Sequence, residues 1–471
     1  MKQSLMNNAF DIAFMGKTEE QIPTQLDVTG VIPEWVNGSL YRNGPGLLST
    51  SNISYKHWFD GLAMIHRFNI QNGQVEYSSK YIETNTRDSI LIDDTITYPE
   101  FATDPCSSIF KKVKSWFVTT NPKVNFTQVN DRFLALGETV LQLELDKDSL
   151  ATLGVHCFSN FKYIPTVTTA HPHIEDSGLY NMVLKMGPFN SYNIIKYNVE
   201  TQQSETICKI PITKPSYIHS IGMSENYFVL LHSPFECTTI DFIIKNRPFI
   251  ENFKWNSKKK SKIWIIEKSS GKIIHKSKVD PFFSFHFINT YEEDDRLIFD
   301  IPKYPNANII GSFYLENLSN IQEEFEAGKI ERFVFDFNLK KIQNSRISDI
   351  PIEMVTIDNR YLKKDYTHCY GLGISKDGNH QFYDQIVKHN VKSGESIIWK
   401  EPDYYPGEPI FIPHINGTDD DDGVILSVLV NIKNREMGSK LLVLDAKTLT
   451  ERASCYTPHV IVPGFHNYFI S

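Results

Sequence analysis

The last ten residues read Val462-Pro463-Gly464-Phe465-His466-Asn467-Tyr468-Phe469-Ile470-Ser471. A lone histidine near a chain end most often lies on the protein surface. Because His466 stands among aromatic residues, we interpret it instead as a candidate metal ligand, which requires partners elsewhere in the chain. In a closed ring of sheets the last strand joins the first sheet, so this segment would also seal the fold.

The composition favours β-structure. The chain of 471 residues contains 31 Phe and 22 Tyr, and aromatic residues are enriched in strands. Short apolar runs recur around turn signals such as Asn72-Gly73 and Ser270-Gly271, which is typical of hairpins. Many strands at even spacing predict a large barrel or a β-propeller, in which a four-stranded blade takes at least about 40 residues. About seven blades would fill the chain, although no clean repeat fixes their number.

Net charge and cysteine content indicate which partners and which cellular compartment to expect. A net charge of -8 and a pI near 6.0 argue against nucleic-acid binding, which needs a dominant basic face. Residues 1–16 lack the unbroken apolar region of a secretory signal, and no apolar run is long enough to span a bilayer. The six cysteines are widely spaced and include no CxxC pair, so we expect a reducing cytoplasm.

Two segments combine aromatic residues with lysines. In residues 106–117, apolar side chains at helical spacing take one face and Lys111, Lys112 and Lys114 the other. This pattern is typical of a helix lying on a membrane surface, and the alternative is an ordinary amphipathic helix docked on the core. Residues 242–264 mix Phe and Trp with Lys258, Lys259, Lys260 and Lys262, among other residues, and form a weaker second candidate. We therefore expect peripheral membrane association.

Four histidines stand in uncharged, strand-like surroundings. They are His171, His219, His286 and His466. A buried imidazole needs partners for its nitrogens, and a metal satisfies one of them, but taken singly each is more often a hydrogen-bonded core histidine. Their wide separation carries no local metal motif and is compatible with ligands that arrive on different blades. Zinc would be satisfied by four ligands, whereas iron(II) prefers more and keeps open positions.

Carboxylates are expected behind such ligands, where they accept the second imidazole N–H and fix each ring. The candidates in apolar or strand-like settings are Glu138, Glu408 and Glu451. As isolated residues, all three would be interpreted as surface glutamates.

The chain resembles the carotenoid cleavage oxygenases, and most closely their animal-type branch of β-carotene oxygenases and the retinoid isomerohydrolase of the retinal pigment epithelium. Several motifs carry the resemblance in the same order along almost the whole chain. They are Gly38-Ser39-Leu40-Tyr41-Arg42-Asn43-Gly44-Pro45-Gly46, His57-Trp58-Phe59-Asp60-Gly61, Ala170-His171-Pro172-His173, Pro215-Ser216-Tyr217-Ile218-His219-Ser220, Phe285-His286-Phe287-Ile288-Asn289, Tyr370-Gly371-Leu372-Gly373, Glu408-Pro409-Ile410-Phe411 and Gly464-Phe465-His466.

The resemblance implies an all-β fold, a seven-bladed β-propeller over residues 1–471, with a cap of helices and loops over the metal-bearing axis. It implies iron(II) on the four histidines, Glu138, Glu408 and Glu451 behind them, and Phe101 as a weaker candidate for the wall of a hydrophobic tunnel. His173 matches no ligand position. Gly137 and Asn467 depart from the usual residues, and four residues of the family pattern are missing before Asp104-Pro105-Cys106.

The implied activity is oxidative cleavage of a conjugated double bond of a carotenoid or apocarotenoid by dioxygen, with carbonyl products. Two alternatives stay open on the sequence alone. One is a retinoid isomerohydrolase of the same fold, which consumes no dioxygen. The other is a non-catalytic propeller that binds a lipid or protein partner.

Overall fold

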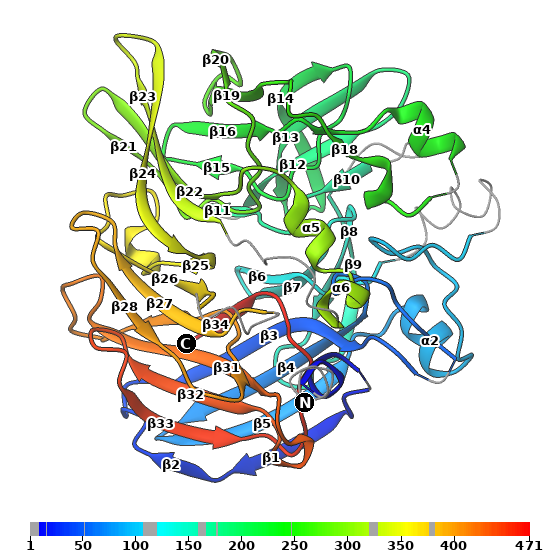
Figure 1. The fold of residues 1–471 in the computed structure, drawn as a ribbon, viewed down its shortest axis with the longest axis vertical. Helices are drawn as coiled ribbons and strands as arrows, with labels where there is room; N and C mark the ends of the chain where they lie inside the picture. Colours follow the sequence, from blue (N-terminus) through cyan, green and yellow to red (C-terminus); the bar gives the residue numbers. More distant parts are fainter. Residues whose placement is uncertain are drawn as a thin grey trace.

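The computed structural model describes residues 9–15, 17–50, 52–106, 120–158, 166–175, 178–245, 247–319, 328–375 and 382–471. Seven antiparallel sheets of four or more strands are arranged around a common centre, and helices are few and short (Figure 1). The chain is therefore a seven-bladed β-propeller, as the sequence predicts.

Each blade is one antiparallel sheet, and its strands are named here in their order across the sheet. The first comprises β1 (Gln21–Leu26), β5 (Gln74–Tyr81), β4 (Leu62–Gln71), β3 (Gly38–Leu47) and β34 (Asn467–Ile470). The second comprises β6 (Asn125–Val129), β7 (Arg132–Leu136), β8 (Leu141–Leu145) and β9 (Thr152–Cys157). The third comprises β10 (Thr166–Thr168), β12 (Gly178–Lys185), β13 (Asn190–Asn198) and β14 (Gln203–Ile212), with β11 (His173–Glu175) also paired to β12.

The fourth blade comprises β15 (Gly222–Met223), β16 (Tyr227–His232), β19 (Ser261–Glu267) and β20 (Ile273–Val279). The fifth comprises β21 (Asn289–Glu293), β22 (Arg296–Lys303), β23 (Lys329–Asp336) and β24 (Lys341–Pro351), and the sixth β25 (Glu353–Thr356), β26 (His368–Gly373), β27 (Gln385–Asn390) and β28 (Ser396–Trp399). The seventh comprises β2 (Val28–Gly30), β33 (Glu451–Tyr456), β32 (Lys440–Asp445), β31 (Gly423–Asn431) and β29 (Tyr404–Tyr405), with β30 (Ile410–Pro413) also paired to β31. A small separate sheet pairs β17 (Phe235–Glu236) with β18 (Lys254–Trp255).

Local sequence explains the hairpins. Asn72 and Gly73 join β4 to β5 with φ angles of 51° and 76°, the left-handed conformation that a two-residue hairpin turn requires. Burial follows position in the blade. The edge strand β20 alternates half-buried and exposed residues, whereas β31 is almost entirely buried, as expected of a strand covered on both faces.

The two ends of the chain close the ring. The last strand, β34, pairs with β3 from Arg42↔Asn467 to Ser39↔Ile470, and β2 pairs with β33 in the last blade. In Figure 1 the red C-terminal segment accordingly lies beside the blue strands of the first blade. The approach is close, because a Cβ on Gly44 would lie 2.6 Å from the Cα of Gly464. The prediction that the C-terminal segment joins the first blade is confirmed.

Short helical segments connect strands of the propeller. They are α2 (Asn85–Leu91), α4 (Thr239–Ile244), α5 (Asn308–Ser312), α6 (Leu315–Ser319) and the 3₁₀ turns Ile250–Asn252, Asn359–Tyr361 and Arg435–Met437. In Figure 1, α5 and α6 project over the centre. A hydrogen bond ties α5 to the loop between β3 and β4, since the Nε2 of His57 lies 2.8 Å from the carbonyl oxygen of Ile310.

The two candidate membrane segments have different outcomes. Nearly all of residues 106–117 lies outside the described residues, so that prediction stays open. In residues 242–264, Phe253 and Trp264 are buried, and Phe249 and Trp255 pack against the core, so these aromatics cannot enter a bilayer. The aromatic part of that prediction is wrong. No helix in the part of the chain that the structure describes is long and apolar enough to cross a membrane.

Candidate metal centre

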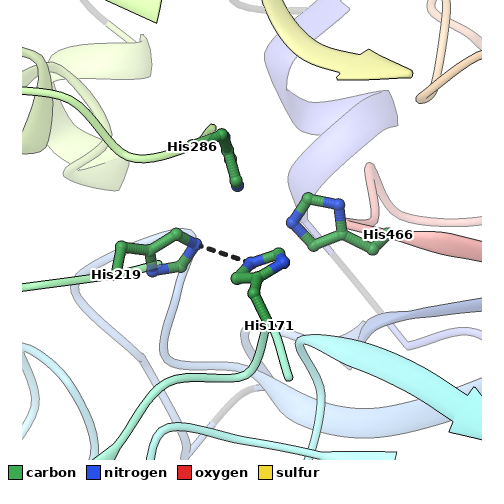
Figure 2. Close-up of side chains that lie close together, drawn as sticks. All are labelled: His171, His219, His286 and His466. Carbon is green, nitrogen blue, oxygen red and sulfur yellow. Dashed lines mark hydrogen bonds between the residues drawn. The ribbon is translucent and has the colours of Figure 1, made fainter. Parts of the chain in front are cut away.

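The four predicted histidines meet at the centre of the ring. Figure 2 shows the rings of His171, His219, His286 and His466 arranged around one point, and one nitrogen from each lies within 4.8 Å of the others. The Nε2 atoms of His171 and His219 are 3.1 Å apart. Two imidazole nitrogens bound at a right angle to one ion, each at about 2.1 Å, are separated by about 3 Å. The spacing therefore suits a shared cation.

The propeller architecture accounts for the convergence. Each histidine lies one to three residues before or after a strand at the inner edge of its blade, next to β10, β15, β21 and β34. The three remaining blades place polar residues at the corresponding position. The seven residues, in blade order from the second blade to the first, are Asn125, His171, His219, His286, Glu353, Glu408 and His466.

Two of the predicted glutamates contact histidines of this cluster. Glu138, which follows β7, accepts a hydrogen bond from Nδ1 of His219 at 2.6 Å, and Glu408 accepts one from Nδ1 of His466 at 2.8 Å. The Tyr217 hydroxyl donates to Glu138 at 2.7 Å. A carboxylate on Nδ1 leaves Nε2 free to bind a metal and fixes the ring.

Glu451 was predicted for this role, and that prediction is wrong. It lies at the start of β33 with its side chain 39% exposed, and it pairs with Lys440 at 3.1 Å. The third carboxylate is instead Glu353, buried at the start of β25, whose Oε2 is 3.1 Å from Nδ1 of His286. Burial raises the pKa of Glu353 to about 7, although the backbone N–H of Met354 opposes the shift.

A pair of substitutions separates the two glutamates. We expect Glu353→Gln to lower metal affinity by about 10- to 100-fold, because the His286 ring loses its anionic acceptor. Glu451→Gln should leave metal affinity unchanged, because that residue touches no ligand. Metal titration of the two purified variants checks the prediction. Equal losses in both variants would contradict this placement.

Asn467, one of the departures from the family pattern, supports the site. Its backbone N–H donates to Oε2 of Glu408 at 2.6 Å, and its side-chain amide donates to the Glu408 carbonyl at 2.7 Å. His171 differs from the other three histidines, because its Nδ1 lies 3.4 Å from the amide nitrogen of Asn125 and no described carboxylate reaches it.

The donor set fits a metal. Burial, followed by the neighbouring imidazoles, lowers the pKa of His171 and of His286 well below the usual histidine range. Both are therefore neutral and offer a lone pair. The buried Nε2 of His286 points toward the other rings (Figure 2) and has no hydrogen-bond partner among the described residues. A cation between the four rings would satisfy it.

A cavity of about 210 Å³ opens onto the centre. His219, His286 and His466 line one part of it, and the predicted Phe101 lies in its wall beside Phe59 at 5.2 Å between ring centroids. The other apolar lining residues are Trp58, Pro99, Val124, Val167, Met186, Tyr217, Phe249, Phe285, Phe313, Met354, Tyr383 and Phe465. Such a wall suits an apolar ligand beside the four histidines.

Sequence reasoning missed Glu353 and Tyr217. Tyr217 stands two residues before His219 in Ser216-Tyr217-Ile218-His219, a spacing that places both side chains on the same side of an extended segment. Glu353 carried a signal as well, because a glutamate between Ile352 and Met354 at the start of an apolar strand is expensive to bury without a partner.

The chain matches the family model described as retinal pigment epithelial membrane protein (RPE65) over residues 14–471. It is 30% identical to the β,β-carotene 15,15'-dioxygenase of Homo sapiens, over 98% of this chain and 95% of the relative. It is also 30% identical to the mitochondrial carotenoid-cleaving dioxygenase of Macaca fascicularis, over 96% and 93% of the two chains.

Two solved structures share the fold at lower identity. A mutant of the Synechocystis apocarotenoid oxygenase superposes with a TM-score of 0.85 at 21% identity and 99% coverage of both chains. The cobalt-substituted form of that oxygenase gives 0.86 at 22% identity, again over 99% of both chains. Because the family model covers nearly the whole chain and full-length relatives reach 30% identity, the chain belongs to the RPE65 family of carotenoid oxygenases.

Proposed function

We propose that this protein is a non-haem iron(II) dioxygenase that cleaves a conjugated double bond of a carotenoid or apocarotenoid into two aldehyde or ketone products. The observation that carries the proposal is the four-histidine centre at one side of an aromatic cavity. The dioxygenase names of the full-length relatives support the same reaction.

Iron(II) suits the donor set better than zinc does. Four neutral imidazoles from His171, His219, His286 and His466 leave the charge of the ion intact, and iron(II) accepts further ligands where a closed zinc site would not. When bound there, iron supplies the binding and activation of dioxygen. Glu138, Glu353 and Glu408 orient three of the rings.

The rest of the chemistry depends on the cavity. Phe59, Phe101 and Phe285 offer flat apolar faces along which a polyene lies, and they displace water from the reacting bond. The reaction balances without an added reductant, because the double bond breaks and each of its carbons receives one atom of dioxygen. The products are two carbonyl compounds.

The test is anaerobic purification followed by iron quantification and oxygen uptake with β-carotene and with a shorter apocarotenal. We expect close to one iron per chain, and two carbonyl products for each dioxygen consumed. Turnover of a retinyl ester without oxygen uptake would establish the isomerohydrolase instead. Absence of iron in protein purified without added metal would indicate a non-catalytic binding protein.

We propose further that residues 1–471 act as one propeller domain and that the protein lies peripherally on a membrane surface. The described part of the chain offers one supporting feature. In α4, Ile240 is 69% and Ile244 is 63% exposed, and the exposed Lys258 to Lys260 lie in the same 239–264 segment. Exposed apolar side chains and exposed lysines within one segment suit an anionic bilayer surface.

Replacing both isoleucines by aspartate (Ile240→Asp with Ile244→Asp) is expected to weaken binding to anionic phospholipid vesicles by at least about tenfold, since each buried isoleucine contributes about 1.5–3 kcal/mol. The matched control is Ile415→Asp, which changes a residue 80% exposed outside this segment. Vesicle co-sedimentation measures the effect. Equal binding of both variants would contradict the assignment of α4.

A further inference from the structure

One wall of the aromatic cavity carries a buried ion pair. The Nζ of Lys123 lies 2.6 Å from Oε2 of Glu100, and the two side chains are only 7% and 8% exposed. The Asn121 amide donates to the other Glu100 oxygen at 2.8 Å. All three residues line the cavity, and Lys123 is the only lysine or arginine among its described lining residues.

The pair stands beside the metal centre. Lys123 precedes Val124, whose carbonyl accepts the backbone N–H of His466 at 3.2 Å. Glu100 precedes Phe101 of the cavity wall. Gly137, which precedes Glu138, packs against the segment Asn121-Pro122-Lys123, since a Cβ on Gly137 would lie 3.3 Å from the Cα of Pro122. A ligand group that reached Lys123 would therefore share the cavity with the bond that is cut.

The ammonium is only partly satisfied. It carries three N–H donors, and the described residues supply one acceptor, Glu100. Burial raises the pKa of Glu100 to about 7 even though Lys123 opposes the shift, so the pair is expensive to bury. A purely hydrocarbon substrate would leave the remaining donors without an acceptor, whereas an oxygen atom on the substrate would accept from them.

We propose that Lys123 is a specificity-determining residue that donates a hydrogen bond to a carbonyl or hydroxyl oxygen at one end of the substrate. The substrate class is then an oxygen-terminated conjugated polyene rather than a hydrocarbon carotene. Glu100 is a positioning residue that holds the ammonium against the wall, and Asn121 holds Glu100. This inference rests on the proposed function, because it concerns what the same cavity accepts.

The decisive variant is Lys123→Met, which keeps an unbranched side chain only one heavy atom shorter and removes its charge. Because that change leaves the buried Glu100 without its cationic partner, the double variant Lys123→Met with Glu100→Gln replaces the whole pair by neutral groups. The matched control is Lys440→Met, which removes an equally buried lysine whose partners, Glu401 and Glu451, lie outside the cavity. Iron content and thermal unfolding show that each variant keeps its fold and its centre.

Binding is measured under anaerobic conditions in the iron-loaded protein, with an apocarotenal and with a hydrocarbon polyene of similar conjugated length as probes. In the wild type we expect tighter binding of the apocarotenal and a shift of its absorption maximum to longer wavelength. The shift arises because a cation stabilises the charge that the excited state moves onto the carbonyl oxygen. Lys123→Met should weaken apocarotenal binding by about 10- to 100-fold and abolish the shift, with hydrocarbon binding unchanged or tighter.

Several results would overturn the role of Lys123. They are a wild type that does not discriminate between the two probes, a Lys123→Met variant that loses both equally, and a Lys440→Met control with the same loss of selectivity. The double variant decides the matter if the single one fails to fold. Selective, Lys123-dependent binding without oxygen uptake would instead overturn the dioxygenase and leave this inference standing.

Discussion

His219→Ala is expected to abolish oxidative cleavage and to leave the purified protein without stoichiometric iron. The substitution removes one of four nitrogen donors and also leaves a partly buried carboxylate without its imidazole donor, since Glu138 accepts from Nδ1 of His219 at 2.6 Å. The loss of metal affinity should exceed the about 10- to 100-fold expected when only a residue behind a ligand is changed. Iron quantification after anaerobic purification, followed by oxygen uptake with an apocarotenal, measures both effects.

His173→Ala is the matched control, because His173 is also partly buried and stands only two residues after the ligand His171. Its Nε2 hydrogen-bonds to the carbonyl of Ile221 at 2.8 Å, and it is not a member of the four-histidine cluster. We expect this variant to keep its iron and its activity. Stoichiometric iron in His219→Ala, or loss of iron in His173→Ala, would contradict the ligand assignment.

The sequence was sufficient for the histidines but not for every residue behind them. His286 and His466 stand among aromatics within recognisable motifs, so their type and setting carry the signal. Glu353 and Glu451 occupy similar local positions, each as the first residue of a strand. Only their positions in the propeller distinguish them. Glu353 begins the inner strand of the sixth blade, whereas Glu451 begins the strand next to the outer edge of the seventh blade.

The error in residues 242–264 has a similar physical cause. The mixture of Phe and Trp with lysines across residues 242–264 predicts a surface patch, yet Lys262 and Trp264 belong to β19, where successive side chains point to opposite faces. Both faces of this strand are covered by neighbouring blades, so Ile263 and Trp264 are buried in different clusters. Burial on two sides depends on the packing of the ring, which local sequence does not specify.

Deleting residues 466–471 is expected to remove both the metal and part of the stability of the fold. The segment contains the proposed ligand His466, and it supplies β34, which covers β3 along the register Arg42↔Asn467 to Ser39↔Ile470. Tyr468, Phe469 and Ile470 pack on two core clusters, so their loss should cost about 3 kcal/mol or more of unfolding free energy. A truncated protein with wild-type iron content and an unchanged Tm would overturn this assignment.

Two smaller changes separate the loss of the metal from the loss of stability. His466→Ala removes the ligand and keeps β34, whereas deletion of residues 468–471 removes most of β34 and keeps His466 with Asn467. A ligand that binds only the folded state stabilises it, so iron should raise the Tm of the apo wild type and should fail to do so for His466→Ala. The deletion should lower the Tm of the apo protein. It should also weaken iron binding, because the strand fixes Asn467, Asn467 holds Glu408, and Glu408 orients His466. Unchanged iron affinity in the deletion variant would show that the ligand and the closing strand act independently.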